Sequence, residues 1–331
     1  MLFRSNRLYD QRPSLIVRCA GHSDVVKGVR FAREQELEIA VKGGGHHVAG
    51  HASCDGGLLL DFSLMRGIQV DPVRQVVTAQ AGCSWRDFDY EAQEFGLAAT
   101  GPIVSMTGLP GFVLGGGFGW LHRKLGLGCD HLTAADLVTA DGQYARASLE
   151  DDPELLWGLR GAGWNFGVVT SMEMKVERIG PRVLAGLVYF PLERFSELVA
   201  FHQAELAAAP SELTTWLILR LAPNVPGIPA AMHGQPVCAI AFCHCGDKIS
   251  AEQWADRIRN GVKQPFADSI SWRSYAEWQG ALDARWGNGF FNDWRSYYLD
   301  AIEPQCVEVI LKHLVRVDSP FTDIDRKSTR L

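Results

Sequence analysis

Residues 41–54 read VKGGGHHVAGHASC, three consecutive glycines followed at once by two histidines. The glycines at 43–45 allow positive φ angles and a close approach of the backbone to a ligand. Successive amides in such a turn can form an anion-binding concavity, which suits a phosphate or pyrophosphate. A metal site is the alternative interpretation. Four side chains on this loop can act as nucleophiles or metal ligands: His46, His47, His51 and Cys54.

The loop follows a predicted strand-helix-strand unit. Residues 15–17 and 39–41 are short apolar runs typical of strands. Between them Ser23 can cap a helix that places Val25 and Val29 on one face. Ligands often bind where such a unit meets a loop, although these glycines do not match the G-x-G-x-x-G fingerprint of a Rossmann fold.

A second glycine-rich segment, TGLPGFVLGGGFGWLHRKLG, covers residues 107–126, and seven of its twenty residues are glycine. At about 1 kcal/mol per glycine relative to alanine, this density argues against an ordinary core helix. The apolar residues among the glycines argue against a flexible linker. We therefore expect backbone wrapped closely around a flat or phosphorylated ligand, with a third glycine-rich bend after residue 160.

Two local patterns between these segments predict regular structure. Ser84 is expected to cap a helix that buries Trp85 and Phe88. Residues 137–147 resemble a β-hairpin, with Asp141 and Gly142 as a type I′ turn.

The residue pattern of the sequence changes after Pro181, where the glycine-rich motifs end. Strand-like runs alternate with amphipathic helical patterns, which predicts an α+β domain whose antiparallel sheet is covered by helices. The predicted strands cover residues 183–190, 214–221 and 236–242, and the predicted helices cover residues 192–208, 251–260 and 304–315.

Composition limits the class of protein. The 331 residues carry a formal net charge of −6, which argues against a nucleic-acid partner and suggests a globular protein of about two domains. No run of 18 apolar residues and no secretory signal appear, so we expect no membrane partner and a cytoplasmic location. The eight scattered cysteines are expected to be mostly reduced core residues.

Both ends of the chain resemble translated sequencing adapter. Residues 2–5, LFRS, and residues 325–331, DRKSTRL, match its two orientations. We hypothesise that residues 1–5 and 325–331 are not native and that the native sequence is a fragment; ordinary termini are the alternative.

Four motifs, in order, carry a family resemblance: VKGGGHHVAG, TGLPGFVLGGGFGWLHRKLGLGCDHL, DLVTADG and LWGLRGAGWNFGVVT. They resemble the FAD-linked oxidases of the vanillyl-alcohol oxidase/p-cresol methylhydroxylase superfamily, and most closely its bacterial berberine-bridge-enzyme-like branch. The resemblance implies an α+β protein with a PCMH-type FAD-binding domain of two α/β subdomains at residues 6–180. An α+β substrate domain with an antiparallel sheet would follow at residues 181–324, C-terminally truncated.

The resemblance also implies the cofactor contacts. His46 matches the histidine that bonds covalently to the flavin; a histidine that only packs on the loop is the alternative. The metal interpretation is disfavoured because adjacent histidines on a strand-like segment point apart and the glycines suit a phosphate better. Relatives with a second covalent bond have cysteine where Val104 stands, so we expect FAD attached through His46 only. The family has arginine at Lys42 and glycine at Trp164. The other implied contacts are Gly43, Gly44, Gly45, His47, Ser105, Thr107, Gly108, Gly111, Gly115, Gly116, Gly117, Asp130, Gly167, Val168 and Val169.

The implied activity is an oxidase reaction. Hydride from an alcohol, sugar or amine carbon of a small molecule would reach flavin N5, with O₂ as acceptor. A flavin dehydrogenase and a non-catalytic FAD-binding fragment are the alternatives. The catalytic base is not assigned; Arg295, Tyr297 and Tyr298 are candidates, although packing of one tyrosine at a helix start explains them equally well. The oligomeric state is left open.

Overall fold

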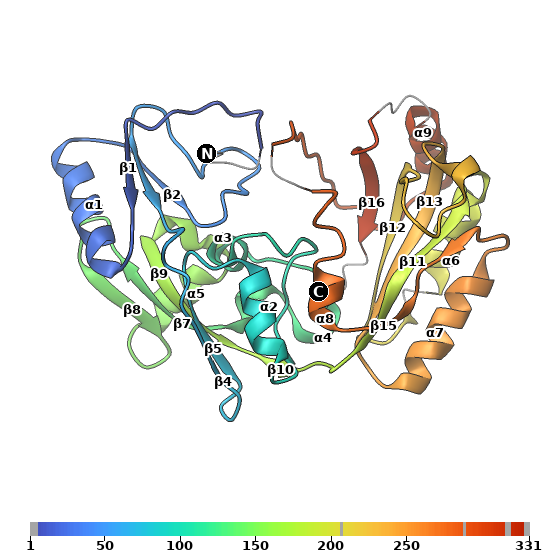
Figure 1. Ribbon diagram of the computed structural model, residues 1–331, viewed down its shortest axis with the longest axis horizontal. Helices are drawn as coiled ribbons and strands as arrows, with labels where there is room; N and C mark the ends of the chain where they lie inside the picture. Colours follow the sequence, from blue (N-terminus) through green and yellow to red (C-terminus); the bar gives the residue numbers. More distant parts are fainter. Residues whose placement is uncertain (1–5, 206–207, 287–288, 315–318, 328–331) are drawn as a thin grey trace. The chain divides into compact units, whose positions relative to one another are not determined.

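The computed structural model describes residues 6–205, 208–286, 289–314 and 319–327 (Figure 1). The chain falls into two compact units. The first contains Met1–Ile179 and Gln279–Arg295, and the second contains Gly180–Trp278 and Ser296–Leu331. Of the predicted non-native ends, residues 1–5 and 328–331 lie outside the described residues, whereas residues 325–327 lie in a strand of the second unit.

The segment Gln279–Arg295 is part of the first compact unit, although it lies within the range 181–324 expected for the substrate domain. Hydrogen bonds near the start of the described chain hold it there. The Asn6 side-chain amide donates to the Asn292 carbonyl at 2.8 Å, and Arg7 N donates to the Phe290 carbonyl at 2.9 Å.

The first unit begins with a three-stranded parallel sheet of order β1(Leu15–Arg18), β3(Leu58–Asp61), β2(Ile39–Lys42). Helix α1(His22–Glu34) packs on it through Val25, Val29 and Ala32. The helix is capped at Gly21 rather than at Ser23, because the Asp24 carboxylate accepts hydrogen bonds from the Ala20 and Gly21 amides. The predicted strand-helix-strand unit is confirmed.

A five-stranded antiparallel sheet forms the rest of this unit. Its order is β4(Ile68–Asp71), β5(Val76–Gln80), β9(Val168–Lys175), β7(Leu132–Val138), β8(Tyr144–Ser148). Helix α2(Trp85–Gln93) is capped by Ser84, as predicted. The remaining elements of this unit are β6(Leu97–Ala98), β10(Glu177–Arg178), α3(Leu109–Leu114), α4(His122–Leu125), α5(Pro153–Ala162), and the 3₁₀ turns Gly128–His131 and Gly163–Asn165.

Two local predictions need correction. The glycine-rich segment 107–126 contains two short helices, α3 and α4, because the apolar residues of α3 pack into the core of this unit. The β7–β8 hairpin forms, but its turn is not type I′: Asp141 is not among the described non-glycine residues with positive φ, whereas Gly142 has φ 77°. The Gly142 amide donates to the Thr139 carbonyl, and only the glycine enters the left-handed region.

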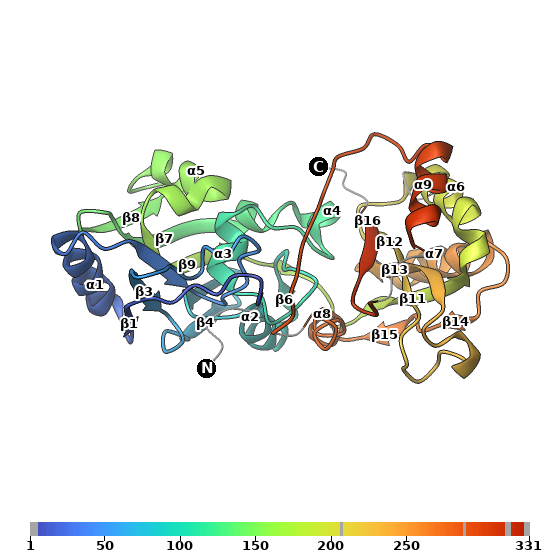
Figure 2. The ribbon, with the colours of Figure 1, turned by 90° about the horizontal axis from the view of Figure 1, so that it is seen from above.

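The second unit is an antiparallel sheet covered by helices, which confirms the predicted architecture (Figure 2). The sheet order is β14(Ala267–Asp268), β11(Val183–Pro191), β13(Pro236–His244), β12(Leu213–Leu221), β16(Asp323–Lys327), with β15(Ser271–Arg273) also paired to β11. Val188, Leu217 and Ile240 belong to the core that this sheet shares with the helices. Those helices are α6(Phe195–Ala204), α7(Lys248–Gly261) and α9(Pro304–Leu314); the short helix α8(Tyr275–Gln279) precedes the returning segment.

One buried carboxyl group of the first unit lacks a hydrogen-bond partner among the described residues. Asp89, on α2, is 1% exposed, and within the described residues neither of its carboxyl oxygens has a hydrogen-bond partner. Burial raises the pKa of Asp89 well above its usual range. The group therefore remains protonated in the folded protein at pH values at which it ionises in the unfolded chain.

We expect Asp89→Asn to remove part of the pH dependence of stability. Above about pH 4 the unfolded chain loses this proton while the folded protein keeps it, so the contribution of Asp89 to the free energy of unfolding falls as pH rises. Urea denaturation from pH 5 to pH 8 should show a growing advantage of the variant over the parent. Asp293→Asn, at a side chain 66% exposed, is the control. Parallel stability curves for parent and Asp89→Asn would contradict the assignment.

Candidate cofactor site

The loop after β2 meets the loop before α3 backbone to backbone. A Cβ on Gly44 would lie 2.4 Å from the Gly108 nitrogen, and a Cβ on Gly108 would lie 2.3 Å from the Gly44 nitrogen. Neither distance leaves room for a side chain, so both positions require glycine. Gly43 lies against Pro110 of α3, and Gly45 has φ 75°. The structure thus brings together the first two glycine-rich segments.

A neighbouring part of the second glycine segment packs on the 3₁₀ turn that contains Asp130. The Gly117 and Gly116 carbonyls accept hydrogen bonds from Gly128 N at 2.7 Å and from Cys129 N at 2.8 Å. The Asp130 carboxylate accepts one from Leu127 N at 2.7 Å, so it caps this turn. By contrast, a Cβ on Gly111 or Gly116 would meet no atom within 4 Å. These two glycines therefore border open space.

His46 lies at the meeting point of the two loops. Its ring carbon Cδ2 is 3.1 Å from the position of a Cβ on Gly44. Burial lowers the pKa of His46 below its usual value, opposed by a hydrogen bond to the Met106 backbone and by the charge of Asp283. The ring is accordingly neutral at pH 7. A neutral imidazole that donates one N–H keeps a lone pair on its other nitrogen, which makes it a potential nucleophile.

Asp283 is the site residue that sequence reasoning missed. Its carboxylate accepts hydrogen bonds from Ser105 N at 2.8 Å and from Ser105 Oγ at 2.6 Å, and it pairs with Arg86 at 2.7 Å. Ser105, predicted to contact the cofactor, thus directs its donors to a carboxylate of the chain itself. No local signal marks Asp283, because 178 residues separate it from Ser105.

The positive charge at the start of the loop is compensated. Lys42 Nζ lies 3.3 Å from Asp61 Oδ2, and the two side chains are 14% and 2% exposed. Although burial opposes it, hydrogen bonds from Ser63 and the charge of Lys42 lower the pKa of Asp61. The glycine loop would therefore hold an anion chiefly through backbone amides.

The other histidines of the loop form an aromatic group with Trp164. The His47 ring lies 4.7 Å from the His51 ring and 5.2 Å from the Trp164 ring, measured between centroids. Cys54 is buried beside Ala40 and Leu59. The described residues contain no group of three or more His, Cys, Asp or Glu that could hold a metal ion.

The remaining predicted contacts divide between the bend and the core. Gly167 has φ 145° and lies against the Val138 carbonyl. Val169 is buried in the core, so its side chain does not face a ligand, whereas Val168 is only partly buried. The backbone of Thr107 is engaged: its carbonyl accepts a hydrogen bond from Trp85 N at 3.0 Å.

The structure gives no support to Arg295, Tyr297 or Tyr298 as the catalytic base. Arg295 pairs with Asp293, and the Tyr297 and Tyr298 side chains are 86% and 97% exposed. No described helix begins at these tyrosines, so the expected packing at a helix start is absent as well.

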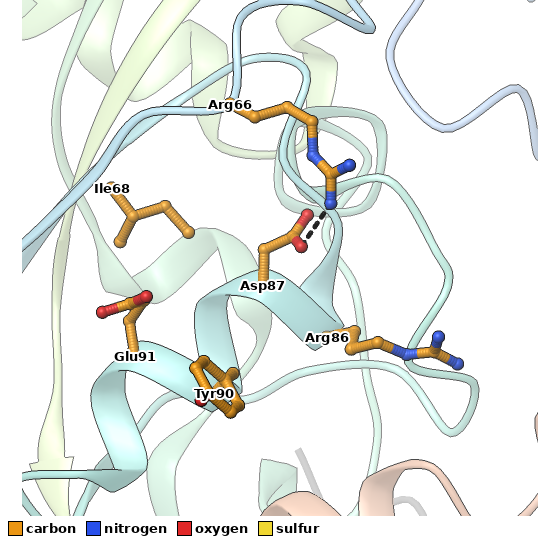
Figure 3. A pocket seen from close by; sticks show the side chains of 6 residues that line it. All are labelled: Arg66, Ile68, Arg86, Asp87, Tyr90 and Glu91. Atoms are coloured by element: carbon orange, nitrogen blue, oxygen red, sulfur yellow. Dashed lines mark hydrogen bonds and ion pairs between the residues drawn. The ribbon is translucent and has the colours of Figure 1, made fainter.

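A surface cavity of about 510 Å³ lies elsewhere on the first unit (Figure 3). Residues of α2, of the segment before β4 and of the first position of β4 line it: Arg66, Ile68, Arg86, Asp87, Tyr90 and Glu91. Arg66 points toward Asp87 and forms an ion pair with it, while Arg86 points away toward the Asp283 cluster. None of the predicted cofactor residues lines this cavity.

Comparisons with known proteins identify the first unit. A family model described as an FAD binding domain matches residues 13–148, which include both glycine loops and His46. (R)-6-hydroxynicotine oxidase of Paenarthrobacter nicotinovorans is 37% identical over 289 residues, 86% of this chain and 61% of that protein. Residues 13–148 match this FAD binding domain family, and the chain is similar to FAD-linked oxidases.

Solved structures show that the similarity extends to the fold of this chain. The crystal structure of 6-hydroxy-D-nicotine oxidase from Arthrobacter nicotinovorans matches with a TM-score of 0.78 at 34% identity, covering 86% of this chain and 61% of that one. Berberine bridge enzyme from Eschscholzia californica shares the fold, with a TM-score of 0.70 at 19% identity. The match covers 81% of this chain and 53% of the berberine bridge enzyme chain.

The chain spans only about three fifths of the length of two curated relatives. The second of these is an FAD-linked oxidoreductase of Dictyostelium discoideum, 33% identical over 90% of this chain and 63% of that protein. Among the described residues, no helix is both long enough and apolar enough to cross a membrane.

A pair of glycine substitutions separates packing from ligand space. Gly44→Ala should destabilise the fold by about 1–3 kcal/mol, because its Cβ would overlap the Gly108 backbone. Gly111→Ala should leave the fold as stable as the parent or more so, yet weaken FAD binding, because its Cβ enters open space beside the loop. Thermal unfolding and FAD titration measure the two effects. Gly21→Ala, which also meets open space but lies outside the site, is the control. Equal FAD affinity for Gly111→Ala and parent would contradict a ligand at that position.

Proposed function

We propose that this chain is the FAD-binding part of an oxidase acting on a small molecule that carries an alcohol, sugar hydroxyl or amine group. The observation that carries the proposal is the position of His46. His46 is a neutral, partly buried histidine between two loops whose contact requires glycine at positions 44 and 108. It lies within residues 13–148, which match an FAD binding domain. When bound, FAD supplies the hydride acceptor.

The residues of the site fit a dinucleotide. Backbone amides of the glycine loop suit its pyrophosphate, since Lys42 is already paired with Asp61. The open space beside Gly111 and Gly116 leaves room for a ligand against bare backbone. His46 would tether the cofactor through the ring nitrogen that does not donate to Met106. Val104, 9% exposed, offers no nucleophile for a second tether.

The substrate class follows from the relatives and is the broadest part of the proposal. One relative is named for a hydroxynicotine, and solved structures of the same fold are named for chitooligosaccharide and xylooligosaccharide. In both amines and sugar hydroxyls, the carbon bonded to the nitrogen or oxygen can lose a hydride while a proton leaves that nitrogen or oxygen. Two electrons and two protons then reduce O₂ to hydrogen peroxide. Reduction of bound FAD by such a substrate without peroxide formation would identify a dehydrogenase instead.

We expect His46→Ala to abolish covalent attachment while leaving dissociable FAD, because the imidazole is the only tether. The parent and the variant are denatured in SDS, and yellow fluorescence that migrates with the polypeptide is compared. His51→Ala, an exposed histidine of the same loop, should retain the attached flavin. Fluorescent polypeptide in His46→Ala would exclude the assignment.

The pH dependence of attachment tests the protonation state of His46. Because burial lowers the pKa of His46, its neutral form should predominate above a midpoint that lies below about 6.5. The rate of FAD attachment to apoprotein should therefore be constant from pH 7 to 8 and decline toward pH 5. Gel fluorescence sampled over time gives the rate at each pH. A midpoint above 7 would show that the nucleophile is a charged or differently placed group.

A further inference from the structure

Trp164 is a large aromatic side chain left open to solvent beside the cofactor site. It lies in the 3₁₀ turn Gly163–Asn165 and is 59% exposed. The turn sits inside the glycine-rich bend, between Gly161 at φ 110° and Gly167 at φ 145°. Asn165 fixes the turn from within, because its side-chain amide donates to the Ala162 carbonyl at 3.0 Å.

The bend and the end of α3 interlock at two glycines. A Cβ on Gly163 would lie 2.5 Å from Leu114 Cδ2, and a Cβ on Gly115 would lie 2.8 Å from Trp164 Cζ2. The bend can approach α3 only because Gly163 has no side chain. The indole in turn reaches Gly115 only because Gly115 has none. The ring is thereby held against bare backbone of the second glycine segment.

His47 supports the indole from the other glycine loop. The two rings meet edge to face, with centroids 5.2 Å apart and planes at 69°. The Ala49 amide donates to His47 Nδ1 at 3.2 Å, which fixes the imidazole, and His51 packs behind it at 4.7 Å. Trp164 thus touches a residue from each of the two predicted cofactor loops. Its outer surface stays open.

A fixed, exposed indole of this kind is suited to stacking on a planar ring. FAD has two ring systems, and the proposed tether commits the isoalloxazine to His46, which is partly buried. The adenine is the planar group that remains for an exposed surface. We propose that Trp164, braced by His47 and Gly115, is a stacking platform for the adenine ring of the dinucleotide. This inference rests on the proposed function, because it presupposes FAD at the site.

The test compares two flavins that differ in adenine. In a His46→Ala background, where the flavin is dissociable, affinities for FAD and for FMN are measured by flavin fluorescence with Trp164, Trp164→Phe and Trp164→Ala. Stacking of one base on an aromatic ring predicts that Trp164→Ala weakens FAD binding about tenfold. FMN lacks adenine, so its affinity should change less than about twofold, and Trp164→Phe should retain most of the FAD affinity. Trp157→Ala, at an indole 76% exposed on α5, should change neither.

Each contrary result overturns a distinct statement. Unchanged or tighter FAD binding in Trp164→Ala would exclude the platform, since the indole would then contribute nothing to FAD binding or would oppose it. Equal weakening of FAD and FMN would place Trp164 against the flavin half and refute the adenine assignment. Failure of the His46→Ala protein with Trp164 intact, and of the parent, to bind FAD at all would refute the proposed function and the platform with it.

Discussion

The close approach of Gly44 and Gly108 is the constraint on which the site depends. Two backbones at this separation exclude any side chain, so the loop after β2 and the loop before α3 act as one surface. His46, one of the residues that follow, is placed against Met106 by the same contact. Glycine here is a steric requirement, and a single added methyl group would separate the loops.

Charge around this surface is largely cancelled within the protein. Lys42 pairs with Asp61, and Arg86 pairs with Asp283. His46 is neutral because burial disfavours the imidazolium form. What remains for a ligand is a set of backbone dipoles, exposed glycine backbone and the rings of His47 and Trp164. Such a surface favours a long, flat molecule with an anionic middle over a compact ion, which agrees with the match of residues 13–148 to an FAD binding domain.

The sequence predicted the elements whose signals are local. The periodicity of Val25 and Val29, the Ser84 cap, and the alternation of strand-like runs with helical patterns after residue 181 all have counterparts in the structure. Local signals misled where two residues compete for one role, as when Asp24 rather than Ser23 determined the start of α1. Asp283 could not be predicted, because its partner Ser105 lies in another part of the chain and a lone aspartate in a polar stretch carries no pattern. In the sequence, Trp164 is notable only because the similar family has glycine at this position. Its contacts with His47 and Gly115 could be found only from the structure.

The Asp283–Ser105 link has a consequence for synthesis of the protein. A chain made at about 5–20 residues per second exposes the Ser105 loop roughly 9–36 s before Asp283, 178 residues later, has been added. During that interval Arg86 and the Ser105 donors lack the carboxylate that joins them in the finished unit. The first unit is therefore completed only after most of the second has been made. Dividing the gene at one point therefore cannot give the two units as separate, intact polypeptides.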